Sequence, residues 1–284
     1  MAGSKPGCRG RKGTSSRPQA SPAGRAGRAR GCERQCGGRG ARDNGSRARP
    51  TPTMTELILI RHGQTELNRG PFFQGQIDVP LNATGLAQAE RLAGRLAGEG
   101  LELIACSDLL RTRQTAAPAS RQLALDPILE AALREQHFGA FEGLSFDECI
   151  ARHPEAFAAW QRHTAGFAVP GGESFSRFHE RVVGAIRALA ARHRGRRVAV
   201  VTHGGVLDMV WRTAHGLPLS GPRDCPTPNT GINRIRVEGD ALQVIAWGDD
   251  AHLADLPAPR APAPGADIAE RLQAPIAPIS PSAR

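Results

Sequence analysis

Two short motifs in this chain contain a histidine and directly follow a run of apolar residues. His62 follows the run 57–60, within the sequence RHGQT, and His203 follows the run 198–201, within the sequence THGG. Such runs are typical of strands that are buried on both faces of a parallel sheet. Ligands of open parallel sheets bind beyond the carboxyl ends of the strands, so both histidines are expected at a binding site.

Two arginines are expected at the same edge of the sheet. Arg61 directly precedes His62, and Arg111 comes shortly after a third apolar run, 101–105. Guanidinium groups present planar pairs of donors that suit a phosphate group. A helix that begins at Gly204 adds free backbone N–H groups, which also favour an anion. The combination indicates a pocket for a phosphate monoester.

This set of side chains suits phosphoryl transfer onto a histidine nitrogen. Because the neighbouring arginines disfavour an imidazolium ion, we expect the pKa of His62 to be lowered, which leaves the ring neutral and nucleophilic. A carboxylic acid, Glu135, would protonate the leaving oxygen and later take a proton from water. Glu142 and Asp147 are neighbouring carboxylates that could fill this role instead. The arginines supply the charge neutralisation, so no metal ion or other cofactor is expected.

Further motifs lie in and between the two histidine segments. In chain order they are RHGQTELN (61–68), QGQIDVPL (74–81), GLAQA (85–89), SDLLRTRQTA (107–116), LRE (133–135), FGAFEG (138–143), PGGES (170–174) and THGG (202–205). Together they resemble the histidine phosphatase superfamily, in its phosphoglycerate-mutase-like branch, over residues 54–250. Within that branch the chain is similar to small bacterial phosphatases of broad specificity and to α-ribazole phosphatases.

The resemblance implies a role for each matching residue. It makes His62 the phosphorylated nucleophile and Glu135 the proton donor and acceptor. It implies a second group of residues that bind the phosphoryl group or border the substrate: Arg61, Asn68, Gln74, Gly75, Arg111, His203 and Gly204. It also implies a metal-independent phosphatase that acts on a small phosphorylated metabolite. The alternative is a phosphoglycerate mutase, but mutases usually carry a longer insertion between the segments that contain Glu135 and Gly171.

The elements that must position these residues alternate between strands and helices. Strands are expected at 57–60, 101–106, 128–133 and 197–202, with an antiparallel hairpin at 232–237 and 242–247. Helices are expected at 84–98 with Thr84 as its N-cap, at 110–123 with a disturbance at Pro118, at 173–193, and from Gly204 to about residue 215. The order predicts a three-layer α/β/α sandwich with a mostly parallel central sheet and an antiparallel edge, which is also the fold that the resemblance implies. Residues 138–172 hold many aromatic side chains and are expected to form short helices over the site.

The two ends of the chain differ in composition from the segment 54–256, which is expected to be the phosphatase domain. Residues 1–53 contain 13 Lys and Arg but only 2 Asp and Glu, so the remaining residues carry a net charge of −1 although the whole chain carries +10. This basic extension has no Leu, Ile, Val, Phe or Trp and is expected to be disordered, with Met54 as a candidate for the true start. Residues 257–284 are rich in Pro and Ala and are expected to be a disordered tail.

Composition also restricts the partners. No apolar stretch reaches the ~18 residues that a membrane span needs, and a cytoplasmic location is expected. The basic extension leaves open a nucleic-acid-associated protein, although it has no aromatic residues for base stacking, so a nucleic-acid partner is disfavoured. The predicted edge hairpin offers a surface for a homodimer.

Overall fold

The computed structural model describes residues 54–256, and the expectations for the two terminal segments lie outside these residues. Six strands form one sheet in the order β3-β2-β4-β1-β5-β6. Their bounds are β1 (Thr55–Arg61), β2 (Leu103–Cys106), β3 (Ile128–Leu129), β4 (Arg197–Thr202), β5 (Ile232–Glu238) and β6 (Ala241–Asp249). The first four strands pair in parallel, whereas β5 is antiparallel to β1 and β6 is antiparallel to β5.

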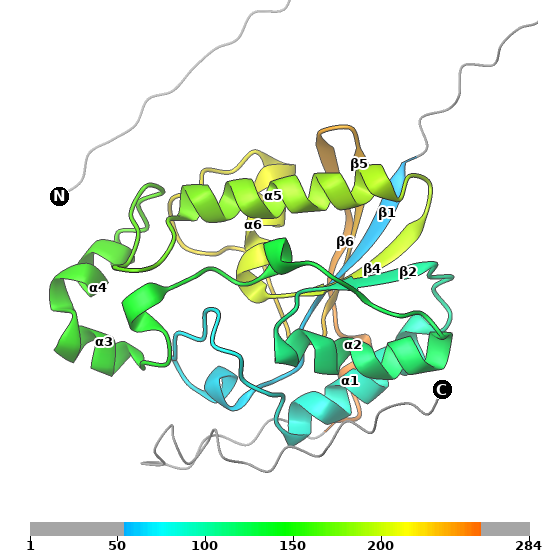
Figure 1. The fold of residues 1–284 in the computed structure, drawn as a ribbon, viewed down its shortest axis with the longest axis horizontal. Coiled ribbons are helices and arrows are strands. Elements are labelled where there is room, and N and C mark those ends of the chain that lie inside the picture. Colours follow the sequence, from blue (N-terminus) through cyan, green and yellow to red (C-terminus); the bar gives the residue numbers. More distant parts are fainter. Residues whose placement is uncertain (1–53, 257–284) are drawn as a thin grey trace, which may run out of the picture. The chain divides into compact units, whose positions relative to one another are not determined.

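Helices cover both faces of the sheet (Figure 1). The elements α1 (Ala83–Leu96) and α2 (Leu110–Leu123) pack on one face, and α5 (Phe175–Arg192) and α6 (Gly204–His215) pack on the other. Side chains of β1 alternate between the faces: Leu57 and Leu59 contact the α5–α6 layer, whereas Ile58 and Ile60 contact the α1–α2 layer. This alternation buries residues 57–60 completely, and the helix layers on both faces confirm the predicted three-layer sandwich with an antiparallel edge.

Three local expectations are wrong. The N-cap of α1 is Asn82, whose Oδ1 accepts from the N–H of Gly85 at 2.8 Å, and Thr84 lies inside the helix. The helix α2 runs through Pro118 without a break. The expected strand 128–133 ends at Leu129, because a turn of 3₁₀ helix follows at Ala131–Leu133 and carries Leu133 into the core beside α5.

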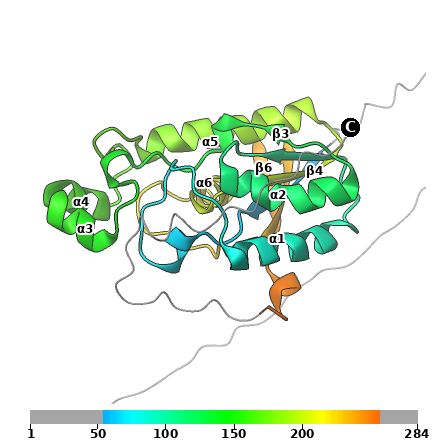
Figure 2. The same ribbon diagram turned by 60° about the horizontal axis from the view of Figure 1, so that its bottom comes forward.

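The expected short helices of residues 138–172 are present as α3 (Phe146–Arg152) and α4 (Pro154–Gln161). They lie together at one end of the sandwich, as both views show (Figure 1, Figure 2). They are held by a small apolar cluster of their own, whose buried members are Phe73, Phe141, Cys149, Phe157 and Val169. Among the described residues, no helix has both the length and the apolar character required to cross a membrane.

Candidate active site

A cavity of about 350 Å³ opens where β1 ends. Seven of the residues expected at the site line it: Arg61, His62, Asn68, Gln74, Gly75, Arg111 and Glu135. His203 and Gly204 are not among the lining residues, although His203 packs directly against His62 and Gly205 does line the cavity. The structure therefore brings segments that are far apart in the sequence to one place, at the sheet edge where the strand pattern predicts them.

His62 is almost completely buried, with 3% of its surface exposed. Its Nδ1 lies 2.7 Å from the carbonyl oxygen of Gly63, so this nitrogen carries the proton and donates it to that oxygen. The lone pair of Nε2 is consequently free. Burial lowers the pKa of His62 well below its usual value, and the positive charges of Arg111 and Arg61 lower it further. The ring is therefore neutral at neutral pH, the form in which an imidazole nitrogen can act as a nucleophile.

His203 is fully buried beside His62, with 5.3 Å between the ring centroids. Its Nε2 lies 2.9 Å from Oγ of Ser107, and that oxygen also accepts from the N–H of Leu109 at 3.4 Å. The hydroxyl proton of Ser107 can then point to Nε2, which leaves Nδ1 of His203 as the donor. Burial, followed by the charge of Arg111, lowers the pKa of His203 well below its usual value.

The two arginines are held by backbone carbonyl groups, and Nε of each has no partner among the described residues. Arg111 is fully buried and donates from Nη1 to Ile77 and from Nη2 to Gly75, both at 2.7 Å. Arg61 donates from Nη1 to the carbonyl oxygen of Thr227 at 2.6 Å. Burial lowers the pKa of each guanidinium to about 10, so both remain charged at neutral pH.

Three buried donors of this site have no partner within residues 54–256: Nε of Arg61, Nε of Arg111 and Nδ1 of His203. A buried donor without an acceptor costs free energy, and native structures rarely leave several in one place. An anion with several oxygens would satisfy all three together. The arrangement therefore fits a phosphoryl group held against His62.

Of the two carboxylates that line the cavity, Asp208 is ion-paired with Arg212, whereas Glu135 forms no ion pair with another described residue. Its Oε1 accepts from the N–H of Gln136 and its Oε2 from the N–H of Gly205, both at 2.9 Å. Gly205 leaves room for this carboxylate, because a Cβ at residue 205 would displace it. Glu142 does not line the cavity and accepts from the N–H groups of Gln76 and Phe138.

The remaining predicted substrate contacts also organise the loop that follows β1. Oδ1 of Asn68 accepts from the N–H of Thr65 at 3.2 Å, and Nε2 of Gln74 donates to Oγ1 of Thr65 at 2.6 Å. Gly75 adopts a φ of +50°, which favours glycine, and its carbonyl oxygen binds Arg111. These three residues therefore line the cavity and tie its wall together.

Several residues of the site were missed by the sequence reasoning. Asn229 donates from Nδ2 to the carbonyl oxygen of His62 at 2.8 Å, and Arg223 lines the cavity. Arg181 donates to the carbonyl oxygens of Ala132, Arg134 and Glu135, and so fixes the segment that carries the carboxylate. A signal for the first two existed, since β5 runs antiparallel to β1 and the residues before it must return to the edge where β1 ends.

The far wall of the cavity is aromatic. It is lined by Phe72, Phe73, Phe138, Phe146, Trp160, His163, Phe175 and Phe178. Trp160 packs edge-on against Phe73 with 4.8 Å between the centroids, and its buried Nε1 has no partner among the described residues. A leaving group that enters this part of the cavity meets apolar faces and one indole donor.

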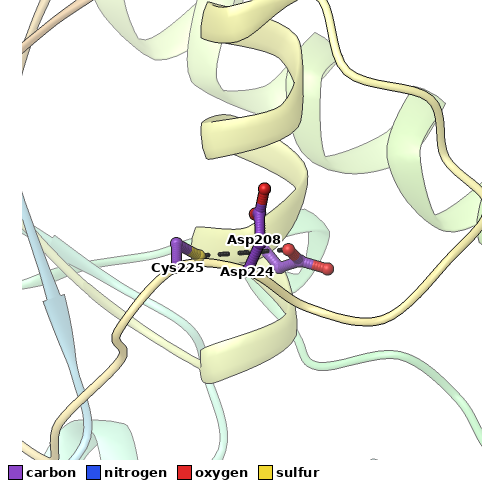
Figure 3. Close-up of side chains that lie close together, drawn as sticks. All are labelled: Asp208, Asp224 and Cys225. Atoms are coloured by element: carbon purple, nitrogen blue, oxygen red, sulfur yellow. Dashed lines mark hydrogen bonds between the residues drawn. The ribbon is translucent and has the colours of Figure 1, made fainter. Parts of the chain in front are cut away.

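Asp208, Asp224 and Cys225 form a compact group beside the cavity (Figure 3). Their candidate ligand atoms lie within 4.8 Å of one another. Asp208, however, is ion-paired with the buried Arg212 at 3.1 Å, and burial raises the pKa of the Cys225 thiol to about 11. Metal binding would require the thiolate and an uncommitted carboxylate, so the group does not fit a metal site.

Comparison with known proteins agrees with this geometry. Residues 57–250 match the sequence profile of the Histidine phosphatase superfamily (branch 1). The chain is 34% identical over 202 residues to Phosphoglycerate mutase-like protein 4 of Arabidopsis thaliana, covering 70% of this chain and 86% of that protein. It is 33% identical over 206 residues to the metal-independent phosphoserine phosphatase of the same plant, covering 72% of this chain and 85% of that protein. The structure resembles a mycobacterial glucosyl-3-phosphoglycerate phosphatase with a TM-score of 0.62 and 29% identity, over 69% of this chain and 100% of that one.

Proposed function

This chain belongs to branch 1 of the histidine phosphatase superfamily, and we propose that it hydrolyses phosphate monoesters of small metabolites through a phosphohistidine at His62, without a metal ion. The observation that carries the proposal is the set of three buried donors without partners beside a neutral, buried imidazole. The metal-independent phosphoserine phosphatase among the relatives supports the same kind of chemistry.

In the first step, Nε2 of His62 attacks the phosphorus atom and the bond from phosphorus to the leaving oxygen breaks. Arg61, Arg111 and His203 hold the three equatorial oxygens, where charge gathers in the transition state. Glu135, protonated for this step, gives its proton to the leaving oxygen, so that an alcohol departs.

In the second step, water attacks the phosphorus atom of the phosphohistidine and the bond to Nε2 breaks. The carboxylate of Glu135 now accepts a proton from the attacking water. The products are inorganic phosphate and the neutral ring of His62. The hydrogen bond from Nδ1 to Gly63 keeps the ring in the tautomer that both steps require.

The test is the release of inorganic phosphate from a panel of sugar phosphates, phosphoserine and aryl phosphates, measured with and without a metal chelator. We expect hydrolysis that the chelator does not change, and its loss in His62→Ala. Hydrolysis that requires added metal, or that survives in His62→Ala, would contradict the proposal.

Phosphoglycerate mutase activity is the second candidate, because one of the similar proteins is named for its likeness to such a mutase. A mutase returns the phosphoryl group to a substrate hydroxyl instead of passing it to water. Incubation with 3-phosphoglycerate and a trace of bisphosphoglycerate separates the two activities. We expect phosphate release to outrun the formation of 2-phosphoglycerate; the opposite order would favour the mutase.

A further inference from the structure

Arg223 lies on the segment between α6 and β5, and its guanidinium reaches the phosphoryl end of the cavity. It lines the cavity, and a Cβ built on Gly204 would lie 3.1 Å from its Nη1 and 3.4 Å from Nε of Arg61. The two guanidinium groups therefore converge beside the first residue of α6. In the part of the chain that the structure describes, no carboxylate forms an ion pair with Arg223, and its Nη1 donates only to Oγ1 of Thr227 at 3.2 Å.

The segment that carries Arg223 is tied to α6 by buried Arg212. This side chain donates from Nη1 and Nη2 to four carbonyl oxygens, those of Pro218, Ser220, Gly221 and Pro222, at 2.6 to 3.2 Å. Its Nε donates to Asp208 at 3.1 Å. Arg212, whose charge Asp208 neutralises, thus fixes the residues immediately before Arg223.

The chain after Arg223 is fixed as well. Sγ of Cys225 contacts Oδ1 of Asp208 at 3.9 Å, a contact that a dashed line marks in Figure 3. The indole N–H of Trp247 donates to the carbonyl oxygen of Pro226 at 2.9 Å. Thr227 contacts both arginines, because its carbonyl oxygen accepts from Arg61 at 2.6 Å and its Oγ1 accepts from Arg223. The backbone is therefore held in place both before and after Arg223, unlike the backbone of a free surface loop.

The positive charges of Arg61 and Arg223 lie close together and repel each other. The charge of Arg223 contributes to the lowered pKa of Arg61, after burial. A bound anion between the two groups would relieve this repulsion and would receive charge-assisted hydrogen bonds from both. Arg61 already faces the anion position with its unpartnered Nε, so the same anion is in reach of Arg223.

We propose that Arg223 is a third arginine of the phosphoryl pocket and binds an oxygen of the phosphoryl group itself, alongside Arg61 and Arg111. The inference rests on the proposed function for the identity of the anion. It assigns a contact to a residue that no motif of the chain contains.

The test compares Arg223→Gln and Arg223→Lys with the wild-type chain, and Arg236→Gln serves as a control that removes an exposed arginine from β5. Binding of inorganic phosphate is measured by calorimetry, which needs no turnover. We expect phosphate to bind about tenfold more weakly to Arg223→Gln, with partial recovery in Arg223→Lys and no change in the control. The value of kcat/KM should fall by a similar factor for p-nitrophenyl phosphate and for phosphoserine.

Unchanged phosphate binding in Arg223→Gln would overturn the inference. A loss confined to phosphoserine would also overturn it, because Arg223 would then serve the carboxylate of the leaving group. Because Arg223 is exposed at the cavity mouth, the variant should keep the wild-type melting temperature. Absence of hydrolysis by the wild-type chain would contradict the proposed function. The phosphate-binding comparison would still show whether Arg223 binds the anion.

Discussion

The two ends of the cavity are built in different ways. The phosphoryl end consists of charged and imidazole groups at the ends of β1 and β4 and at the start of α2, all fixed by hydrogen bonds to the backbone or to Ser107. The aromatic end consists of rings from α3, α4, α5 and loops, several of which pack against one another. The first end is rigid and suits one chemical group, whereas the second excludes water and can accept leaving groups of different shape. Under the proposed mechanism, the phosphoryl end carries out the reaction and the aromatic end selects the substrate.

The largest effect is expected from Glu135→Gln, which removes the proton donor at the boundary of the two ends. Hydrolysis of alkyl phosphates should fall about 10²- to 10⁴-fold, because their leaving oxygen needs a proton. With p-nitrophenyl phosphate, whose leaving group needs none, the first turnover should survive while steady-state hydrolysis falls. Stopped-flow measurement of nitrophenol release separates the two steps, with Asp147→Asn as the exposed-carboxylate control. An equal loss in the first turnover for both substrate types would contradict the role of Glu135 as the acid.

The next effect is expected from Arg111→Lys at the phosphoryl end. Lysine keeps the charge but loses the fixed pair of donors to Ile77 and Gly75 and the free Nε, so kcat/KM should fall about 10²- to 10³-fold for every substrate. Steady-state kinetics with alkyl and aryl phosphates measure this, and Arg113→Lys, on the exposed side of α2, is the matched control. If the decrease in kcat/KM depended on the leaving group, the two ends of the cavity would not act independently.

A smaller and selective effect is expected from Trp160→Leu at the aromatic end. The change removes an aromatic face and the indole N–H, so KM for aryl phosphates should rise up to about tenfold. The inhibition constant of inorganic phosphate should stay the same, because phosphate binds at the other end. If phosphate inhibition weakens as much as aryl phosphate binding, the two ends are not independent.

The smallest effect is a difference in the pH dependence of stability. The pKa values of His62 and His203 are lowered in the folded chain, so below about pH 6.5 the unfolded chain binds protons that the folded chain does not. The contribution of these histidines to the free energy of unfolding should therefore be fully present above this pH. Below it, the free energy of unfolding should fall by at most about 1.4 kcal/mol per pH unit for each histidine. Urea denaturation at several pH values should give a shallower fall for His203→Gln. As a control, Phe157→Leu in the aromatic cluster should lower the free energy of unfolding by the same amount at every pH. If the free energies of unfolding of His203→Gln and the wild-type chain fall in parallel with pH, this account is contradicted.

The fold could be predicted from the sequence because its strands are continuous apolar runs. Leu57–Ile60 is buried on both faces, a pattern that suits a central strand with helices packed on both sides of the sheet. The predicted start of α1 was wrong because two neighbouring residues can both serve as its N-cap. Thr84 and Asn82 are both good N-caps, and the chain uses the one that places Gly85 and the start of α1 against Gln64.

The candidate site could be predicted in part, for the residues that lie directly after strands. Arg61, His62 and Arg111 are placed by the ends of β1 and the start of α2, and the cavity contains all three. Arg223 and Asn229 could not be found from a motif, because a Pro-rich connection carries them and tertiary hydrogen bonds to Arg212, Asp208 and His62 position them. The aromatic residues were recognised by type, but nothing in their spacing gives the cluster that Phe73 forms with Trp160.

The account depends most on the identity of the atom that accepts the phosphoryl group. The direct measurement is to mix Glu135→Gln with p-nitrophenyl phosphate, quench the mixture in alkali after one turnover, and locate the phosphoryl group by peptide mass spectrometry. The account predicts an acid-labile adduct on His62 that wild-type chain forms transiently and His62→Ala does not form. An adduct on His203 or on a carboxylate, or turnover by His62→Ala, would contradict it.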